Sequence, residues 1–88
     1  MKHFVNLLPD AERELTEIWL AADDRDAVTE AADRIEKALA HDPASFGESR
    51  GDGSRISFAP PLAVRFSVMV DDRRVDLGHF WQIADRSR

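Results

Sequence analysis

RISFAPPLAVRFSVMVDDRRVDLGHFWQI, residues Arg55 to Ile83, is the stretch that decides the fold. Apolar and polar residues alternate with a period of two over 62–70 and again over 75–83, and this period is typical of half-buried β-strands. Pro60-Pro61 closes a first short strand over 55–59, and Asp71-Asp72-Arg73-Arg74 makes a turn. The stretch therefore predicts a three-stranded antiparallel meander.

A short strand and two amphipathic helices are predicted ahead of the meander. Residues 3–8 form an apolar run, and Pro9 suits the first position of a helix because its fixed φ is already helical. Apolar residues recur at helical spacing in two stripes. The stripes are Ala11, Leu15, Ile18, Trp19 and Ala22, then Val28, Ala31, Ala32, Ile35, Ala38 and Leu39. Trp19 is expected in the core with the rest of its stripe.

The predicted fold class is α+β, in a single domain over residues 1–88. The two helices form an antiparallel hairpin that packs on one face of an antiparallel or mixed sheet, and the other face is open. Residues 41–54 are rich in Gly, Ser and Pro, so this connection is predicted to be a long loop. Its conformation over Gly47–Ser54 cannot be derived from the pattern.

Charge is distributed unevenly along the chain, whose formal net charge is −5. Residues 1–46 hold 11 acids and 5 bases, a net of −6, and residues 47–88 hold 6 acids and 7 bases, a net of +1. An anionic partner is therefore expected to bind the second half. The acidic total disfavours tight, unaided binding to nucleic acid, because such binding depends on neutralising phosphates.

Several classes of site are excluded by composition. The chain has no cysteine, so it has no disulfide and no thiolate metal site. No ligand spacing typical of a metal site occurs, and no cofactor is expected. No run of about 18 apolar residues is present, so we expect no membrane span. A cytoplasmic protein is the default expectation.

The order of these motifs resembles the RelE/ParE superfamily, the toxins of type II toxin–antitoxin pairs. Residues 5–19 read V-x-L-x-P-x-A-E-R-E-L-x-x-I-W and look like that family's first strand and helix. Residues 31–39, A-A-D-R-I-E-x-x-L, followed by Asp42-Pro43, look like its second helix. Residues 47–50, G-E-S-R, with Arg55 and the P-L-x-V-x-F-x-V run of 61–68, resemble its meander. The resemblance covers nearly the whole chain.

The resemblance implies a small toxin that arrests growth until a cognate antitoxin binds it. RelE-like members cut mRNA on the ribosome with basic side chains, whereas ParE-like members inhibit DNA gyrase and lack that set. Arg55 and Arg65 lie on strands where RelE-like members place catalytic groups. However, the C-terminal tyrosine is missing, Arg86 and Arg88 only partly match the terminal arginine cluster, and Arg50 stands alone where lysines are expected. These departures favour a ParE-like or atypical toxin.

Arg65 and Arg55 are the candidate catalytic residues. Arg65 is flanked by Val64 and Phe66, so it points away from the buried face and could stabilise charge on a phosphate. The alternative is an exposed strand arginine that pairs with an acid such as Asp76. Arg55 begins its strand and is either a second cation of the site or a solvated residue.

Candidate binding residues for the target or the antitoxin are Arg50, Phe80, Trp81 and Arg86. Alternation places Phe80 with polar residues on the open face, where an aromatic ring could stack on a base or contact an antitoxin. The same alternation places His79 with the buried residues, so it is predicted to be packed or at the rim. Trp81 is either core or an anchor for a partner.

Two classes of function remain open. The first is a RelE/ParE-type toxin, with a cognate antitoxin and either gyrase or the ribosome and mRNA as partners. Its ribonuclease version needs Arg55, Arg65 and one of Arg50 or Arg86 to converge. The second is a non-catalytic module of the same fold, whose open face or edge strand docks a partner peptide or a second copy of the chain.

Overall fold

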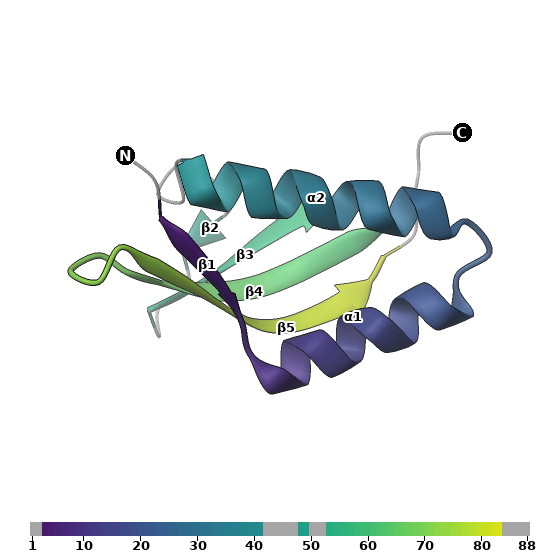
Figure 1. Cartoon of the computed structure of the whole chain (residues 1–88), viewed down its shortest axis with the longest axis horizontal. Coiled ribbons are helices and arrows are strands. Elements are labelled where there is room, and N and C mark those ends of the chain that lie inside the picture. Colours follow the sequence, from purple (N-terminus) through teal and green to yellow (C-terminus); the bar gives the residue numbers. More distant parts are fainter. Residues whose placement is uncertain (1–2, 42–47, 50–52, 84–88) are drawn as a thin grey trace.

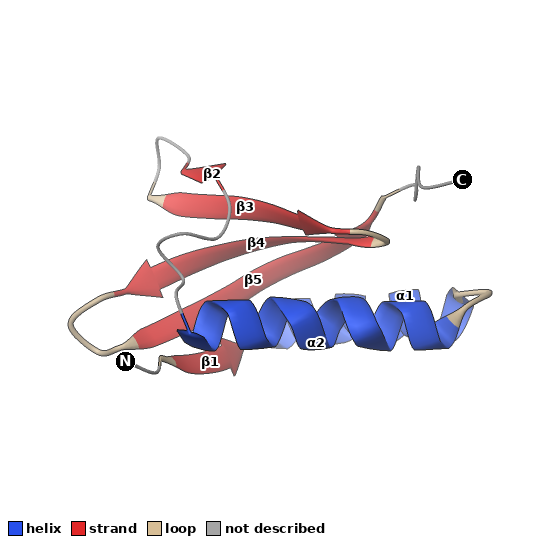
Figure 2. Ribbon diagram, turned by 90° about the horizontal axis from the view of Figure 1, so that it is seen from above, coloured by secondary structure: helices blue, strands red, loops and turns tan. Residues whose placement is uncertain are grey.

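A five-stranded mixed sheet forms one layer of the molecule, and two helices form the other (Figures 1 and 2). The computed structural model describes residues 3–41, 48–49 and 53–83. The elements are β1 (Phe4–Leu7), α1 (Pro9–Ala21), α2 (Arg25–His41), β2 (Glu48–Ser49), β3 (Ser54–Ala59), β4 (Leu62–Met69) and β5 (Arg74–Gln82). The predicted α+β class, with a helical hairpin on one face of the sheet, is confirmed.

The sheet has the order β1-β5-β4-β3-β2, so the predicted meander of β3, β4 and β5 lies at its centre. β1 pairs in parallel with β5, and β2 pairs antiparallel with β3. The connection predicted as a loop thus contains a two-residue strand, which adds a short outer edge to the sheet. Residues 42–47 and 50–52 lie outside the described part of the chain.

Both helices begin where local chemistry predicts. α1 starts with Pro9 at its first position and carries Asp10 and Glu12 in its first turn, where the helix dipole favours negative charge. At the start of α2, the backbone N–H of Ala27 donates to Asp24 Oδ1 at 3.1 Å. The acidic residues between the helices therefore satisfy an otherwise free backbone donor.

The core lies between α2 and the inner face of the sheet. Four α2 side chains are fully or almost fully buried: Val28, Ala31, Ile35 and Leu39. They pack against the buried side chains of β4 and β5, which include Leu62, Val64, Phe66, Val75, Leu77 and Phe80. The predicted stripe of α2 is confirmed at these four positions, whereas Ala32 and Ala38 are half-buried. Trp19 of α1 is an exception, because 38% of it is exposed and it does not belong to the core.

A β-bulge interrupts the pairing of β4 with β5. Phe66 pairs with Leu77 and Arg65 with His79, so Gly78 is an extra residue on β5. The extra residue reverses the alternation in the rest of the strand. Phe80 is therefore buried, with 4% of it exposed, so the prediction of a Phe80 on the open face is wrong. His79 is exposed, which leaves the rim and not the core of the two positions predicted for it.

Candidate functional site

The open face of the sheet, on the side away from the helices, is the candidate site that the sequence indicated. Residues opposite each other in an antiparallel pair point to the same face. Arg65 pairs with Ile56 on β3 and His79 on β5, whereas Arg55 pairs with Phe66, which is buried under the helices. Arg65 therefore lies on the open face, and Arg55 lies on the inner face.

The two candidate catalytic arginines thus do not come together. Arg65 is exposed, whereas Arg55 is half-buried and its Nε atom is inaccessible to solvent. The separation follows from the short turn at Pro60-Pro61, which sets Ala59 opposite Leu62 and so fixes the register of the whole pair. One phosphate group cannot be held by both guanidinium groups across the thickness of a sheet.

Arg65 is available to a partner. Within the described residues, no ion pair or hydrogen bond engages its side chain. The acid considered as its partner, Asp76, is bound elsewhere: Arg74 Nε lies 2.9 Å from Asp76 Oδ1, and Asn6 donates to the same oxygen at 3.2 Å. The alternative of an Arg65–Asp76 ion pair is therefore wrong.

Two aromatic side chains stand beside Arg65 on the open face. Phe58 of β3 and Trp81 of β5 both pair with Ala63 of β4, so the three residues form one row across the sheet. Phe58 is 53% exposed and Trp81 is 37% exposed. Trp81 was a predicted binding residue and is accessible, whereas Phe58 was missed. Its outward position could have been found by counting back from the Pro60-Pro61 turn.

His79 is held at the edge of the sheet by α1. Its Nδ1 atom lies 3.3 Å from Glu14 Oε1, and the same oxygen accepts a hydrogen bond from the backbone N–H of Phe80 at 3.0 Å. Half of the His79 side chain is exposed, so it is a rim residue. Its contact with Glu14 draws it toward α1.

Phe80, another predicted binding residue, does not lie on the open face. Phe80 is buried in the core and contacts the helices, so it cannot stack on a base or meet a partner there. Arg50 and Arg86 lie outside the described residues. What the described part of the face offers is one free guanidinium beside two exposed aromatic rings, an arrangement suited to binding a partner.

Neither a cluster of metal-binding side chains nor a membrane-spanning helix is found in the part of the chain that the structure describes. No group of three or more His, Cys, Asp or Glu side chains is placed there to hold a metal ion. None of the described helices combines the length and the apolar character needed to cross a bilayer.

Solved structures with this arrangement come from toxin–antitoxin systems. A chain of the RelBE2 complex from Mycobacterium tuberculosis matches with a TM-score of 0.77 and 12% identity, over 93% of this chain and 99% of that one. A chain of the ParDE system from P. aeruginosa matches with a TM-score of 0.68 and 16% identity, over 94% and 98%. The chain has the RelE/ParE toxin fold. The isolated RelE toxin of E. coli matches with a TM-score of 0.62 and 11% identity, over 97% and 88%.

The similarity covers the fold over nearly the full length of the chain. It does not extend to the sequence, because fewer than one residue in five is identical. No protein-family model matches the sequence, and no curated protein does. RelE and ParE structures match about equally well, so the fold does not distinguish between their mechanisms.

Proposed function

We propose that this chain is the toxin of a type II toxin–antitoxin pair, which arrests growth until its cognate antitoxin binds it. The observation that carries the proposal is the match, over more than nine-tenths of the chain, to structures of the RelBE and ParDE systems. The order of motifs in the sequence supports it independently. The toxin is expected to act in the cytoplasm.

Within this proposal, a ParE-like or atypical target is favoured over mRNA cleavage on the ribosome. Phosphodiester cleavage needs several groups around one phosphate to activate the nucleophile and stabilise charge. Arg55 and Arg65 lie on opposite faces, and His79 is drawn toward Glu14. The net charge of −5 also opposes binding to ribosomal RNA. DNA gyrase is therefore the first target to test.

Growth under tightly controlled expression tests the toxin proposal. We expect induction of the chain alone to stop growth, and co-expression of its antitoxin to restore it. Continued growth with soluble protein confirmed in the cells would exclude a toxin in that host and would favour the non-catalytic binding module. If growth stops, supercoiling by purified gyrase should be inhibited, and primer extension should show no new mRNA ends.

Substitution of Arg65 tests whether the open face contacts the target. Arg65→Ala removes a side chain without partners in the described structure, so folding should be unaffected. Toxicity should fall, so that at least tenfold more inducer is needed to stop growth. Arg13→Ala is the matched control, because Arg13 is an exposed arginine on α1 whose pairing with Asp10 is also exposed. Full toxicity of a well-folded Arg65→Ala protein would remove Arg65 from the site.

A further inference from the structure

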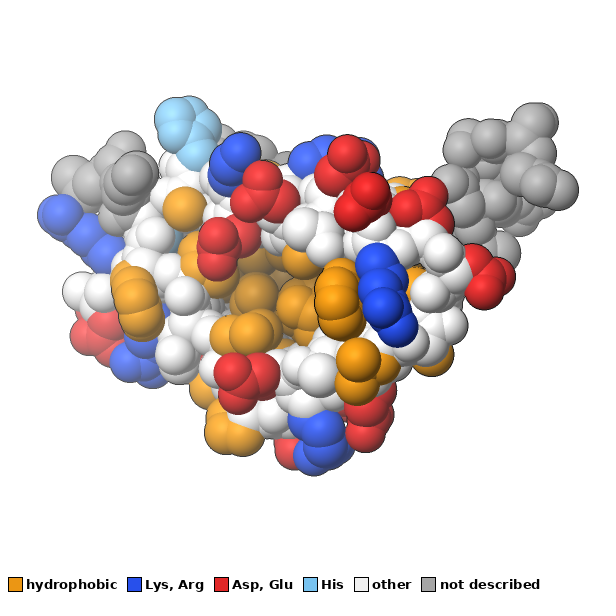
Figure 3. Space-filling view, turned by 45° about the vertical axis from the view of Figure 1, so that its right-hand side comes forward, with side chains coloured by type: hydrophobic (Ala, Val, Ile, Leu, Met, Phe, Trp, Pro, Cys, Tyr) orange, Lys and Arg blue, Asp and Glu red, His pale blue; other side chains and the backbone are white. Residues whose placement is uncertain are grey.

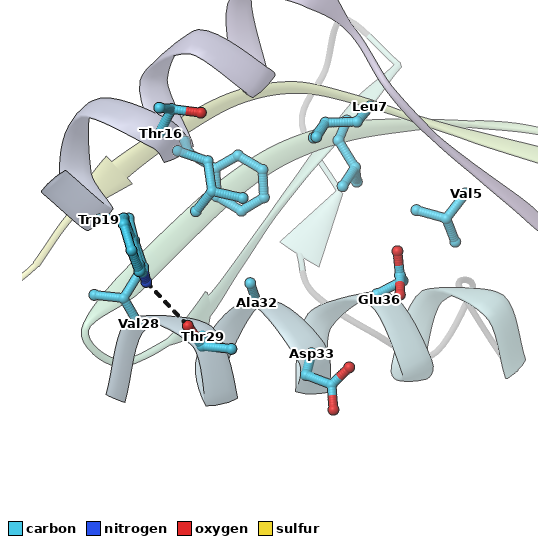
Figure 4. A pocket seen from close by; sticks show the side chains of 12 residues that line it. Val5, Leu7, Thr16, Trp19, Val28, Thr29, Ala32, Asp33 and Glu36 are labelled. Atoms are coloured by element: carbon cyan, nitrogen blue, oxygen red, sulfur yellow. Dashed lines mark hydrogen bonds between the residues drawn. The ribbon is translucent and has the colours of Figure 1, made fainter. Parts of the chain in front are cut away.

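An open pocket with a volume of about 430 Å³ lies between the two helices and the β1–β5 side of the sheet. Figure 3 shows it as an apolar hollow with acidic side chains at its margin, and Figure 4 shows the side chains that line it. Leu15, Val28, Leu77 and Phe80 contribute apolar surface from three elements. The sequence did not reveal it, because Trp19 was assigned to the core.

Trp19 forms a fixed wall of this pocket. Its Nε1 donates to Thr29 Oγ1 on α2 at 3.1 Å, a bond that joins the two helices at one end of the pocket (Figure 4). The guanidinium of Arg25 lies 4.7 Å from the centre of the indole ring, and Arg25 also donates to the carbonyl groups of Trp19 and Leu20. These contacts hold the ring in place before any partner arrives, so little ordering cost opposes binding.

The pocket continues into a second depression along α2. The second depression, of about 800 Å³, lies against His3, Phe4 and the end of α2, and it shares Val5 and Glu36 with the first. Phe4 at its margin is 66% exposed. Two adjoining hollows along one helix make an elongated trough, which fits a length of polypeptide better than a compact small molecule. An amphipathic helix fills such a groove with side chains spaced three or four apart.

The charge around the trough indicates the charge of the partner that it favours. Residues 9–41 of the helical hairpin hold 10 acids and 4 bases, a net of −6. Asp33 and Glu36 line the first hollow, which has no Lys or Arg among its described lining residues, and Lys37 lines the second hollow beside Glu36. Among the described residues, Asp33 pairs with Lys37 in an exposed contact, and Glu36 makes no ion pair. An occupant with Lys or Arg beside its apolar residues would complement this margin, and an acidic one would be repelled.

We propose that the trough receives a basic amphipathic helix of a partner protein, with a large apolar side chain inserted beside Trp19. Identifying that partner as the antitoxin rests on the proposed function. The helix would contact Asp33 and Glu36 through Lys or Arg residues that flank its apolar stripe. This site is on the opposite side of the molecule from Arg65, so a partner bound in the trough leaves the open sheet face uncovered.

Two synthetic peptides test the proposal with purified chain. Both are 15-residue alanine-based helices with leucines three and four residues apart, one flanked by lysines and the other by glutamates at the same positions. Trp81→Phe leaves Trp19 as the fluorescent reporter of the pocket. We expect the lysine peptide to shift the emission of Trp19 and to bind about tenfold more tightly than the glutamate peptide, an effect of several exposed charge pairs.

Charge reversal supplies the decisive comparison. The double variant Asp33→Lys, Glu36→Lys should reverse the preference, whereas Glu12→Lys, Glu17→Lys, which makes the same change in charge on α1 away from the lining, should keep it. Ala32→Phe should place a large side chain in the pocket and weaken the binding of both peptides. Equal binding of both peptides, an unchanged preference in the double variant or no binding to the folded chain would overturn the inference. None of these results depends on whether the chain arrests growth, which tests the proposed function separately.

Discussion

Phe80 is buried and His79 lies at the rim because of one residue. Gly78 has no partner opposite it on β4, so the strand advances by one position and every later side chain changes face. The bulge interrupts the pairing of the strands, and the burial of Phe80 offsets this loss. The Phe80 side chain joins the core and lines the pocket between the helices. His79 is thereby left at the rim, within reach of Glu14.

Replacing Phe80 by alanine should destabilise the fold strongly. We expect Phe80→Ala to lower the free energy of unfolding by about 3–5 kcal/mol, because a buried aromatic side chain is lost and a cavity remains. Phe58→Ala is the matched control on the open face and should cost less than about 1 kcal/mol, since Phe58 is 53% exposed. Urea unfolding of both variants measures the difference. Similar losses in the two proteins would contradict the register change at Gly78.

The two arginines and the bulge differ in how far the sequence could predict them. Arg65 and Arg55 sit on known strands, and their separation follows from the two-residue turn at Pro60-Pro61, so the sequence contained enough information to place them on opposite faces. The bulge at Gly78 is different. A glycine within an alternating strand indicates that a bulge is possible, but nothing local states whether the extra residue forms.

At the scale of elements, β1 and α1 together cover one edge of the central meander. β1 pairs with the first half of β5, from Arg74 to Leu77, and the N–H of Leu8 extends the pairing by donating to Leu77 at 3.1 Å. Beyond that point Glu14 of α1 accepts the N–H of Phe80. A side chain thus replaces a strand at a donor that would otherwise be exposed at the edge.

Removing the carboxylate of Glu14 should weaken this edge. Glu14→Ala is expected to lower the free energy of unfolding by about 1.5–3 kcal/mol, because the part-buried N–H of Phe80 loses a charged acceptor. Glu14→Gln should cost less, since its amide oxygen can still accept the bond. Thermal or urea unfolding gives both values. Glu17→Ala, on the same helix without such a contact, should stay within about 0.5 kcal/mol of the parent. An equal effect at positions 14 and 17 would refute the role of Glu14.

The helices were the most predictable elements, and the margins of the sheet were the least. Helical spacing identified the buried stripe of α2 because that stripe packs directly on the sheet. Trp19 follows the same spacing on α1, but it lines the open pocket and 38% of it stays exposed. β2 has two residues and no pattern of its own, so only its pairing with Ile56 and Arg55 defines it.

Considered as a whole, the molecule presents two different surfaces on its two sides. The helical side is acidic and holds the apolar trough, whereas the open sheet face presents Arg65 with Phe58 and Trp81. The proposed functions use them separately, with the antitoxin on the helical side and the target on the sheet. Sequence composition indicated this division through the charge difference between residues 1–46 and 47–88. It could not indicate the trough, which exists only once both helices pack on the sheet.

The concentration of acids on the helices makes the stability of the whole molecule depend on salt. The molecule measures 39 × 26 × 25 Å, and the screening length at about 10 mM salt is about 30 Å, so acids repel one another across most of it. We expect an increase to about 150 mM sodium chloride to stabilise the fold by about 1 kcal/mol, or to raise Tm by about 5 °C, because screening weakens this repulsion more than the few exposed ion pairs. The triple variant Glu12→Gln, Glu17→Gln, Glu30→Gln removes three acids that make no ion pair with described residues. We expect it to be more stable than the parent at low salt and to lose most of the stabilisation that added salt gives the parent. Calorimetry at both salt concentrations measures the effect, and a Tm that falls with added salt would show that attraction between charges outweighs their repulsion.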